Sequence, residues 1–346
     1  GVNAAPLERP PMKYEDAGVD IDRKAGTLKA AASKIKETYT PDVLRGIGAF
    51  GGMIDASRLK GLEQPVLVAS TDGVGTKTML AAQTGRYGGL GFDIVNHCVN
   101  DLLVQGAKPL FFLDYVASAR LQPNILGTVL ASLADACKAV GIPLLGGETA
   151  EMPGVYHADG LDLVGTIVGV VDKTSIVDGS RVQPEDVLLA LPSSGLHTNG
   201  YSLARKIFEG WNLEEPRAEL GGQSLADALL EPHKCYLEPV SKLLNEGIEI
   251  KAMAHITGGG VYENLPRVLP EGLGAEIETR TWLVPPIFPL IQQIGSIHQD
   301  EMYRVFNMGL GYILVLDESE AVKVATLLPE SSRVGYIIGR SGITVR

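Results

Sequence analysis

The chain has 346 residues, of which 45% are hydrophobic, and its formal net charge at pH 7 is -11. This length allows two domains of ordinary size, each with its own core, which disfavours a structural or disordered role. Nucleic acids and anionic membranes select basic surfaces, and no run of five or more Lys or Arg residues occurs. We therefore expect neither partner. A phosphorylated substrate is compatible with the negative charge, because a bound divalent cation reverses the local sign of a site.

The cysteines and the lack of sorting signals indicate the compartment. Cys98, Cys137 and Cys235 form an odd set without CxxC spacing, and the first two fall in helical patterns where a buried thiol is usual. The sequence contains no long apolar run and no amino-terminal signal, so we expect a soluble protein of the reducing cytoplasm. A start at Gly1 instead of Met indicates a cloning remnant or a domain of a longer polypeptide. Residues 1–13 are expected to be a flexible lead-in.

The predicted amino-terminal domain, residues 14–172, begins with two segments of open function. Residues 14–22 carry four carboxylates, which fit a solvated turn and a functional loop about equally well. An Ala-rich stretch of helical spacing follows, as far as Lys36. Residues 46–52 then place four glycines around Phe50. This composition suits a flap over a nucleotide, and it suits an ordinary surface loop at least as well.

A glycine-rich turn after a short apolar strand is the first candidate site. The run 66–69 predicts a buried strand, and Gly73 and Gly75 allow a tight turn into a helix. Asp72 then lies at the carboxyl end of a strand, where α/β folds place their chemistry, beside amide groups that can receive a phosphate. Taken alone, such a turn is more often a simple connection from strand to helix.

Two more acidic residues follow in apolar surroundings. The run 92–106 predicts an amphipathic helix with Asp101 outside the apolar stripe, as is usual for a solvated side chain. The run 109–117 predicts a buried strand with Asp114 in its middle. A carboxylate in such a place costs several kcal/mol unless it is paired or binds metal.

A second loop of glycines and acids completes the amino-terminal domain. A predicted helix at 123–140 is followed by an apolar run at 142–145, which leads into the loop 146–156 with Glu148 near its start. The β-branched run 161–171 predicts the last strand, and the domain boundary is placed near residue 172.

The carboxyl-terminal domain, residues 173–346, alternates predicted strands and helices, which indicates an α/β or α+β fold. Two of its loops leave a strand and precede a helix. They are the polar loop 193–199 and the glycine-rich loop 255–260. Loops of this kind can cradle a phosphate or another part of a substrate.

The acidic residues point to a cation if the fold brings them together. Carboxylates about 4 Å apart repel by roughly 4 kcal/mol per pair at an effective dielectric near 20, so such a group persists only with cations. Oxygen ligands select Mg²⁺ or another hard ion, and Mg²⁺ with several glycine loops suits an enzyme that uses a nucleoside triphosphate. The usual motifs of P-loop, Rossmann and protein-kinase folds are absent from the sequence.

Six motifs in order closely resemble the aminoimidazole ribonucleotide synthetase (phosphoribosylformylglycinamidine cyclo-ligase) family over nearly the whole chain: DAGVDID, STDGVGTK, VNDLLVQGAKPLFFLDY, GGETAEMPGVY, SSGLHTNGYSLARK and HITGGG. The resemblance implies an α/β (α+β) enzyme of purine biosynthesis that uses ATP and Mg²⁺ to close the imidazole ring of a phosphoribosyl substrate, formylglycinamidine ribonucleotide, releasing ADP and phosphate. It also implies a homodimer in which the amino-terminal domains join strands into a shared barrel, with active sites near that interface. The carboxyl-terminal domain is expected to hold a mixed sheet with helices.

The resemblance also implies roles for individual residues. The metal ligands would be Asp72, Asp101, Asp114 and Glu148. The nucleotide and phosphate contacts would be Phe50, Gly51, Gly73, Gly75, Thr76, Lys77, Gly146, Gly147 and Thr149. The substrate contacts would be Ser194, Gly195, Asn199, Thr257, Gly258 and Gly259. The catalytic residues would be Asp72 and Asp114, with His197 or His255 accepting a proton or orienting the substrate, although each His is as often structural.

The reaction implied by the resemblance is phosphorylation of the formyl oxygen by ATP, followed by attack of a substrate nitrogen and departure of phosphate. Two alternatives remain at this stage. One is another ATP-dependent enzyme of the same superfamily, such as formylglycinamidine ribonucleotide synthetase, selenophosphate synthetase or thiamine-phosphate kinase. The other is a catalytically silent nucleotide-binding protein, against which the intact acidic set is evidence.

Overall fold

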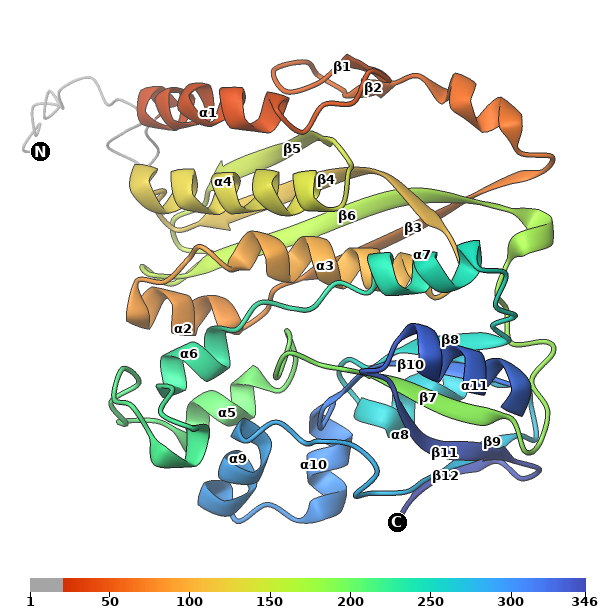
Figure 1. Ribbon diagram of the computed structural model, residues 1–346. Coiled ribbons are helices and arrows are strands. Elements are labelled where there is room, and N and C mark those ends of the chain that lie inside the picture. Colours follow the sequence, from red (N-terminus) through yellow and green to blue (C-terminus); the bar gives the residue numbers. More distant parts are fainter. Residues whose placement is uncertain (1–20) are drawn as a thin grey trace, which may run out of the picture.

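The computed structural model describes residues 21–346, which form two large sheets with helices packed against them and one small two-stranded sheet (Figure 1). The expected lead-in at 1–13 and most of the acidic turn at 14–22 lie outside the described residues. One large sheet lies in each half of the chain, so the protein has the mixed α/β architecture that its sequence indicates. Within the described part of the chain, no helix is both long and apolar enough to cross a membrane.

The first sheet is built from four strands, β3 (Pro65–Gly73), β6 (Leu161–Asp172), β4 (Lys108–Ser118) and β5 (Leu144–Glu151), in that spatial order. Only the β4 and β5 pair is parallel. The helices of this half are α1 (Ile21–Lys36), α2 (Lys77–Thr84), α3 (Leu90–Leu103) and α4 (Pro123–Ala139). A small hairpin, β1 (Val43–Arg45) and β2 (Met53–Ile54), and a short 3-10 helix, η2 (Ala56–Gly61), lead into the sheet.

Alternate residues of the first sheet face α1, α3 and α4 and form a core with them. The buried Cys98 of α3 and Cys137 of α4 belong to this core, as their helical spacing predicted. The opposite side of the sheet, which we call the open sheet face, is apolar and keeps part of its surface exposed; Leu67 on it is 64% exposed. Its apolar part is formed by Leu67, Ala69, Phe111, Leu113, Tyr115, Val164 and Val168, and the hydroxyls of Thr71 and Thr166 lie on the same face.

The register of this sheet aligns two of the predicted acids. Asp72 of β3 and Asp114 of β4 both pair with Gly165 of β6, which runs antiparallel to both strands. Paired residues point to the same face, so both side chains lie on the helix-covered side, with Cα atoms about 10 Å apart, which is two strand spacings. A side chain at Gly165 would collide with Phe112 and Ile94. Packed core atoms therefore lie between the two carboxylates.

Two strands extend into segments that the sequence indicated as loops. β3 continues to Gly73, because β6 has 12 residues and pairs with β3 along its whole length. β5 includes all of residues 146–151, which pair in parallel with β4. Gly147 is required here by space, because a Cβ atom would overlap the carboxylate of Asp114 on the adjacent strand.

The second sheet has six strands, in the spatial order β12 (Gly342–Val345), β9 (Gly274–Ile277), β11 (Ser332–Ile338), β7 (Val187–Pro192), β10 (Leu310–Leu316) and β8 (Ala252–His255). One core joins it to α5 (Tyr201–Ile207), α6 (Leu225–Leu230), α8 (Gly260–Asn264), α9 (Ile287–Gly295) and α10 (Gln299–Val305). A second core on the other face joins it to α7 (Leu237–Asn245) and α11 (Glu318–Leu327). Figure 1 shows α6 beside α2 and α7 beside α3, where the two halves meet.

Candidate functional site

Two of the predicted acids, Asp72 and Asp101, meet where the two halves of the chain join. His97 of α3 lies between them, with its Nε2 atom 2.9 Å from Oδ2 of Asp72 and 3.5 Å from Oδ2 of Asp101. His255, at the end of β8 in the other half, places Nδ1 2.8 Å from Oδ1 of Asp101. The side chains of Asp72 and Asp101 are 44% and 29% exposed, whereas those of the two histidines are almost fully buried. The carboxylates are thus the solvent-facing part of this group.

The charges of this group stabilise one another. Burial lowers the pKa of His97, but hydrogen bonds and charges from Asp101 and Asp72 outweigh it and raise the pKa to about 9. Burial raises the pKa of Asp101, and the hydrogen bonds from His255 and His97 bring it well below its usual range. The pKa of Asp72 is lowered as well, since the hydrogen bond from His97 outweighs partial burial. At neutral pH, His97 is therefore an imidazolium between two carboxylates.

The two histidines that the sequence nominated as proton acceptors are occupied by other contacts. His255 uses Nδ1 toward Asp101, and its Nε2 lies 2.9 Å from Nε2 of His233. His197 stacks on His233 with ring centroids 3.9 Å apart, and its Nε2 accepts a hydrogen bond of 3.1 Å from the backbone N–H of Ser194. Burial lowers the pKa of both His197 and His255. Neither ring offers a free acceptor nitrogen to a substrate in this arrangement.

His197 nevertheless keeps two unusual features. Its backbone has a φ of 61°, a left-handed conformation that costs a non-glycine residue free energy. Its Nδ1 atom is buried without a hydrogen-bond partner among the described residues, and Nδ1 carries the ring proton because Nε2 is an acceptor. His197 can therefore donate a hydrogen bond but cannot accept a proton at that atom.

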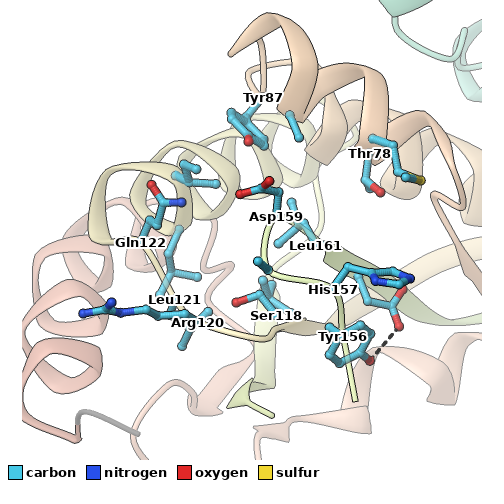
Figure 2. A pocket seen from close by; sticks show the side chains of 18 of the residues that line it. Thr78, Tyr87, Ser118, Arg120, Leu121, Gln122, Tyr156, His157, Asp159 and Leu161 are labelled. Atoms are coloured by element: carbon cyan, nitrogen blue, oxygen red, sulfur yellow. Dashed lines mark hydrogen bonds between the residues drawn. The ribbon is translucent and has the colours of Figure 1, made fainter. Parts of the chain in front are cut away.

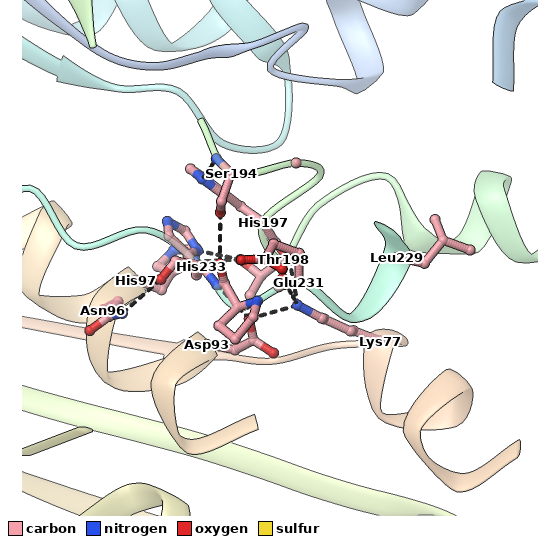
Figure 3. A network of polar contacts seen from close by, with 12 residues as sticks. Lys77, Asp93, Asn96, His97, Ser194, His197, Thr198, Leu229, Glu231 and His233 are labelled. Carbon is pink, nitrogen blue, oxygen red and sulfur yellow. Dashed lines mark hydrogen bonds and ion pairs between the residues drawn. The ribbon is translucent and has the colours of Figure 1, made fainter. Parts of the chain in front are cut away.

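Lys77 lies in a buried ion pair, whereas the resemblance implied a contact with a phosphate. Its side chain and that of Asp93 are both 0% exposed, with Nζ 2.7 Å from Oδ1 of Asp93 (Figure 3). Nζ also donates to the carbonyl oxygens of His197 and Glu231, in the other half of the chain. Asp93 in turn accepts a hydrogen bond from the backbone N–H of His233. Lys77 thus joins the two halves and has no solvent-facing surface for a nucleotide.

The other two predicted acids, Asp114 and Glu148, lie in a different place. Asp114 sits under the helix layer near Cys137, and burial together with the charge of Glu148 raises its pKa to about 7. A cavity of about 340 Å³ beside α1 and α4 is lined by Asp114, Glu148, Phe50, Gly146, Gly147 and Thr149. This cavity collects most of the nucleotide contacts predicted from residues 46–52 and 146–151; Gly51 is not among its lining residues.

The prediction of one four-acid cluster is therefore wrong for a single described chain. No three of the four carboxylates lie close enough to hold one ion; the compact groups of potential ligands are His97 with Asp101 and His255, and His197 with His233 and His255. The register explains the division, because Asp72 and Asp114 flank β6 with core side chains between them. Sequence order alone could not show which strand separates them.

A larger cavity of about 980 Å³ opens beside the glycine turn (Figure 2). Gly75 and Thr76 line it from one side, and the segment 155–162 lines it from another. The arginines that line it are Arg120 and Arg205, and His157 lines it as well. The volume lies within the range of small-molecule sites. The sequence reading missed both arginines, since a lone Arg in a loop or helix carries no motif signal.

The two predicted substrate loops of the carboxyl-terminal half meet each other. The side chain of Asn199 lies against Gly258, and the Nδ2 atom of Asn199 is buried without a hydrogen-bond partner among the described residues. Ser194 donates its hydroxyl to the carbonyl of Pro232, and Thr257 donates its own to Asn264. The remaining members of the predicted set are Gly195, which has a φ of 155°, and Gly259, which precedes α8 in a left-handed conformation. These loops border the histidines described above.

Comparison with known proteins places these features in a family. The family described as "AIR synthase related protein, N-terminal domain" matches residues 55–171, and "AIR synthase related protein, C-terminal domain" matches residues 183–346. A phosphoribosylformylglycinamidine cyclo-ligase from Bacillus mycoides (strain KBAB4) is 45% identical over 341 residues, which cover 96% of this chain and 97% of that protein. The chain belongs to the AIR synthase related family. A protein of the same name from Bacillus cereus (strain B4264) is 46% identical over 333 residues and covers 95% of each chain.

The AIR synthase related fold also occurs in solved structures of much lower sequence identity. E. coli HypE, a hydrogenase maturation protein, has a TM-score of 0.66 at 17% identity and covers 92% of each chain. A HypE structure in complex with ATP has a TM-score of 0.67 at 17% identity, covering 95% of this chain and 93% of that one. Thiamine-monophosphate kinase from Stenotrophomonas maltophilia K279a has a TM-score of 0.65 at 17% identity, covering 92% and 95%. At this identity the likeness supports the fold alone.

Proposed function

We propose that this AIR synthase related chain is a phosphoribosylformylglycinamidine cyclo-ligase. It closes the imidazole ring of formylglycinamidine ribonucleotide, with ATP cleaved to ADP and phosphate, in purine biosynthesis in the cytoplasm. The observation that carries the proposal is the identity of 45–46% with cyclo-ligases over at least 95% of both chains. The similarity therefore spans both halves of the chain.

The residues at the junction of the halves fit a Mg²⁺-bound triphosphate. Asp72 and Asp101 are ionised, partly exposed and offer only oxygen ligands, which is the donor set that a hard cation prefers. Mg²⁺ held there would neutralise charge on the phosphates of ATP. The amide of Gly73 donates to Oδ1 of Asp72 and that of Val74 to Leu163, so the donors proposed for a phosphate beside the acids are the amides of Gly75 and Thr76 and the hydroxyl of Thr76. Lys77 is assigned a structural role.

We place the phosphoribosyl substrate in the cavity of about 980 Å³, which begins at Gly75 and Thr76 and therefore adjoins the acidic pair. Arg120 and Arg205 suit its phosphate group, because Arg binds phosphate through charge-assisted hydrogen bonds. The loops at 193–199 and 255–260 close the other side of the junction.

The chemistry follows from the poor leaving ability of the formyl oxygen. Transfer of the γ-phosphoryl group of ATP to that oxygen makes a good leaving group, after which the substrate nitrogen attacks the carbon and phosphate departs. Catalysis of phosphoryl transfer relies mainly on positioning and electrostatic stabilisation. The ring nitrogens of His197 and His255 that could accept a proton already take part in hydrogen bonds within the protein. We therefore assign these two histidines to positioning and not to proton removal.

A homodimer would account for the open sheet face and for the divided acids. A second copy that covers the apolar side chains of β3, β4 and β6 would remove them from water and join the two sheets into a barrel. Glu148 follows Gly147 on β5, so its side chain points to the open face, opposite to that of Asp114. We propose that the site is shared, with the cavity of Phe50 and Glu148 from one subunit serving the junction of the other.

The decisive experiment follows the formyl oxygen. With formylglycinamidine ribonucleotide labelled by ¹⁸O at the formyl position, ATP and Mg²⁺, we expect aminoimidazole ribonucleotide, one ADP per ring closed, and the label in inorganic phosphate. Neither glutamine nor ammonia should be required, which distinguishes the reaction from that of an amidotransferase-type synthetase. Label in water, or ring closure without ATP cleavage, would exclude the phosphoryl-activation mechanism. Absence of any ring closure would exclude the function.

A further inference from the structure

Five side chains from both halves of the molecule form a circuit of short polar contacts, which we call the hydrogen-bond ring. From Asp101 the ring runs to His255 at 2.8 Å, from there to His233 at 2.9 Å, and on to Thr198 at 3.3 Å. Thr198 contacts Nδ1 of His97 at 2.7 Å, and Nε2 of His97 returns to Asp101 at 3.5 Å. Figure 3 shows His97, Thr198 and His233 of this ring converging.

Charge and burial allow the ring one set of proton positions. A carboxylate only accepts, so the proton of His255 is on Nδ1, toward Asp101. The contact between His255 and His233 joins two Nε2 atoms and needs one proton. A second buried imidazolium would be costly, so His255 stays neutral and His233 carries the proton on Nε2. The Nδ1 atom of His233 is then an acceptor.

The hydroxyl of Thr198 determines the remaining proton positions in the hydrogen-bond ring. It donates its single proton to Nδ1 of His233, so its oxygen accepts from Nδ1–H of His97. His97 also donates from Nε2 to Asp72 and Asp101, which makes it the one imidazolium of the ring. Every nitrogen in the ring is thereby satisfied. Each of the two groups of potential metal ligands, His97 with Asp101 and His255, and His197 with His233 and His255, therefore has two members whose ring nitrogens are already engaged in the hydrogen-bond ring.

Two of the five links cross between the halves of the chain, from Thr198 to His97 and from His255 to Asp101. Asp101 is contacted by His255 on one side and by His97 on the other, and Asp72 is contacted by His97. We infer that Thr198 and His233 are positioning residues: they touch neither carboxylate, but they close the ring that fixes the orientation of Asp72 and Asp101 across the junction. The inference deepens the proposed function, because it assumes that these carboxylates work in catalysis, while the ring itself can be tested without activity.

The activity test compares two substitutions of one side chain. Thr198→Val keeps the shape and removes the hydroxyl, and a displaced carboxylate should lower kcat/KM for ring closure by roughly 10- to 100-fold. Thr198→Ser restores the hydroxyl and should retain most of the activity. Thr38→Val is the matched control, because the buried hydroxyl of Thr38 also donates to one backbone group and accepts from another, away from the ring. Equal losses in Thr198→Val and Thr38→Val would overturn the positioning role.

The proton positions in the hydrogen-bond ring can be measured by ¹⁵N–¹H correlation spectra of protein labelled at histidine. These spectra distinguish an imidazolium from each neutral tautomer. We expect His97 as the imidazolium, His255 with its proton on Nδ1 and His233 with its proton on Nε2. Thr198→Val should change the signals of His233 and His97, and Thr198→Ser should restore them. Another tautomer of His233 or His255 in the wild type would refute the ring whatever the activity. If the spectra are as expected but the protein has no cyclo-ligase activity, the proposed function is refuted and the hydrogen-bond ring is confirmed.

Discussion

Replacing Lys77 by Met tests whether this residue is a structural clamp or a phosphate ligand. The ammonium and the carboxylate of Asp93 are both 0% exposed and 2.7 Å apart. Burial lowers the pKa of Lys77 and raises that of Asp93, and each is opposed by the charge of the other. Removal of one partner leaves a buried charge uncompensated, which costs about 3–5 kcal/mol. We expect Lys77→Met to lose that much of the free energy of unfolding.

The loss should depend on pH in a defined direction. Without the ammonium, the pKa of Asp93 in the folded state lies further above its unfolded value of about 3.9. A group whose pKa is raised by folding favours the folded state at low pH, and that contribution is lost as the pH rises through the folded pKa. The deficit of Lys77→Met should therefore be larger at pH 8 than at pH 5.5. Equilibrium urea unfolding followed by circular dichroism measures both values.

The double variant Lys77→Met with Asp93→Asn removes both charges and keeps an acceptor for the backbone N–H of His233, so it should recover most of the loss. Lys138→Met is the matched control, because Lys138 forms an exposed pair with Glu37 and should change little. Stability of Lys77→Met equal to that of the wild type, together with a raised KM for ATP, would refute the clamp and restore the phosphate role.

Three further predictions concern the other parts of the site. Asp114→Asn should stabilise the free protein at pH 8, because the folded-state pKa of Asp114 is raised to about 7 and its ionisation at higher pH costs stability. In thermal unfolding, the difference from the wild type should shrink toward pH 4. The variant should also lose activity, and unchanged stability would refute the burial argument. Arg120→Gln should raise the KM for the phosphoribosyl substrate roughly 10-fold or more, the value of a charge-assisted hydrogen bond, with the KM for ATP unchanged; Arg58→Gln, in an exposed pair with Asp42, is the control. Leu67→Asp on the open sheet face should halve the particle mass measured by light scattering and lower the activity. Leu283→Asp, at a site that is 92% exposed, is the control and should change neither. An active monomer would exclude the shared site.

The sequence was sufficient for the features that depend on local pattern and on motif order. Helical spacing predicted α1, α3 and α4, and apolar runs predicted β4 and β6, because a buried face imposes its period on the residues that form it. The motif order identified the family, which the relatives confirm. It also indicated Asp72, Asp101 and His255, which the structure brings together: His97 joins Asp72 to Asp101, and His255 contacts Asp101 directly.

Tertiary structure alone decided which of these residues meet. The sequence predicts Asp72 at the end of one strand and Asp114 in the middle of another. The two residues lie on either side of β6, and only the pairing of both with Gly165 shows that core atoms separate them. Lys77 sits in a motif that suits a phosphate, but its environment is fixed by Asp93 and by two carbonyls more than 100 positions away. Burial and hydrogen-bond partners are properties of contacts between distant segments, so a linear pattern can propose a charged residue for a site but cannot say whether the charge faces solvent or another buried charge.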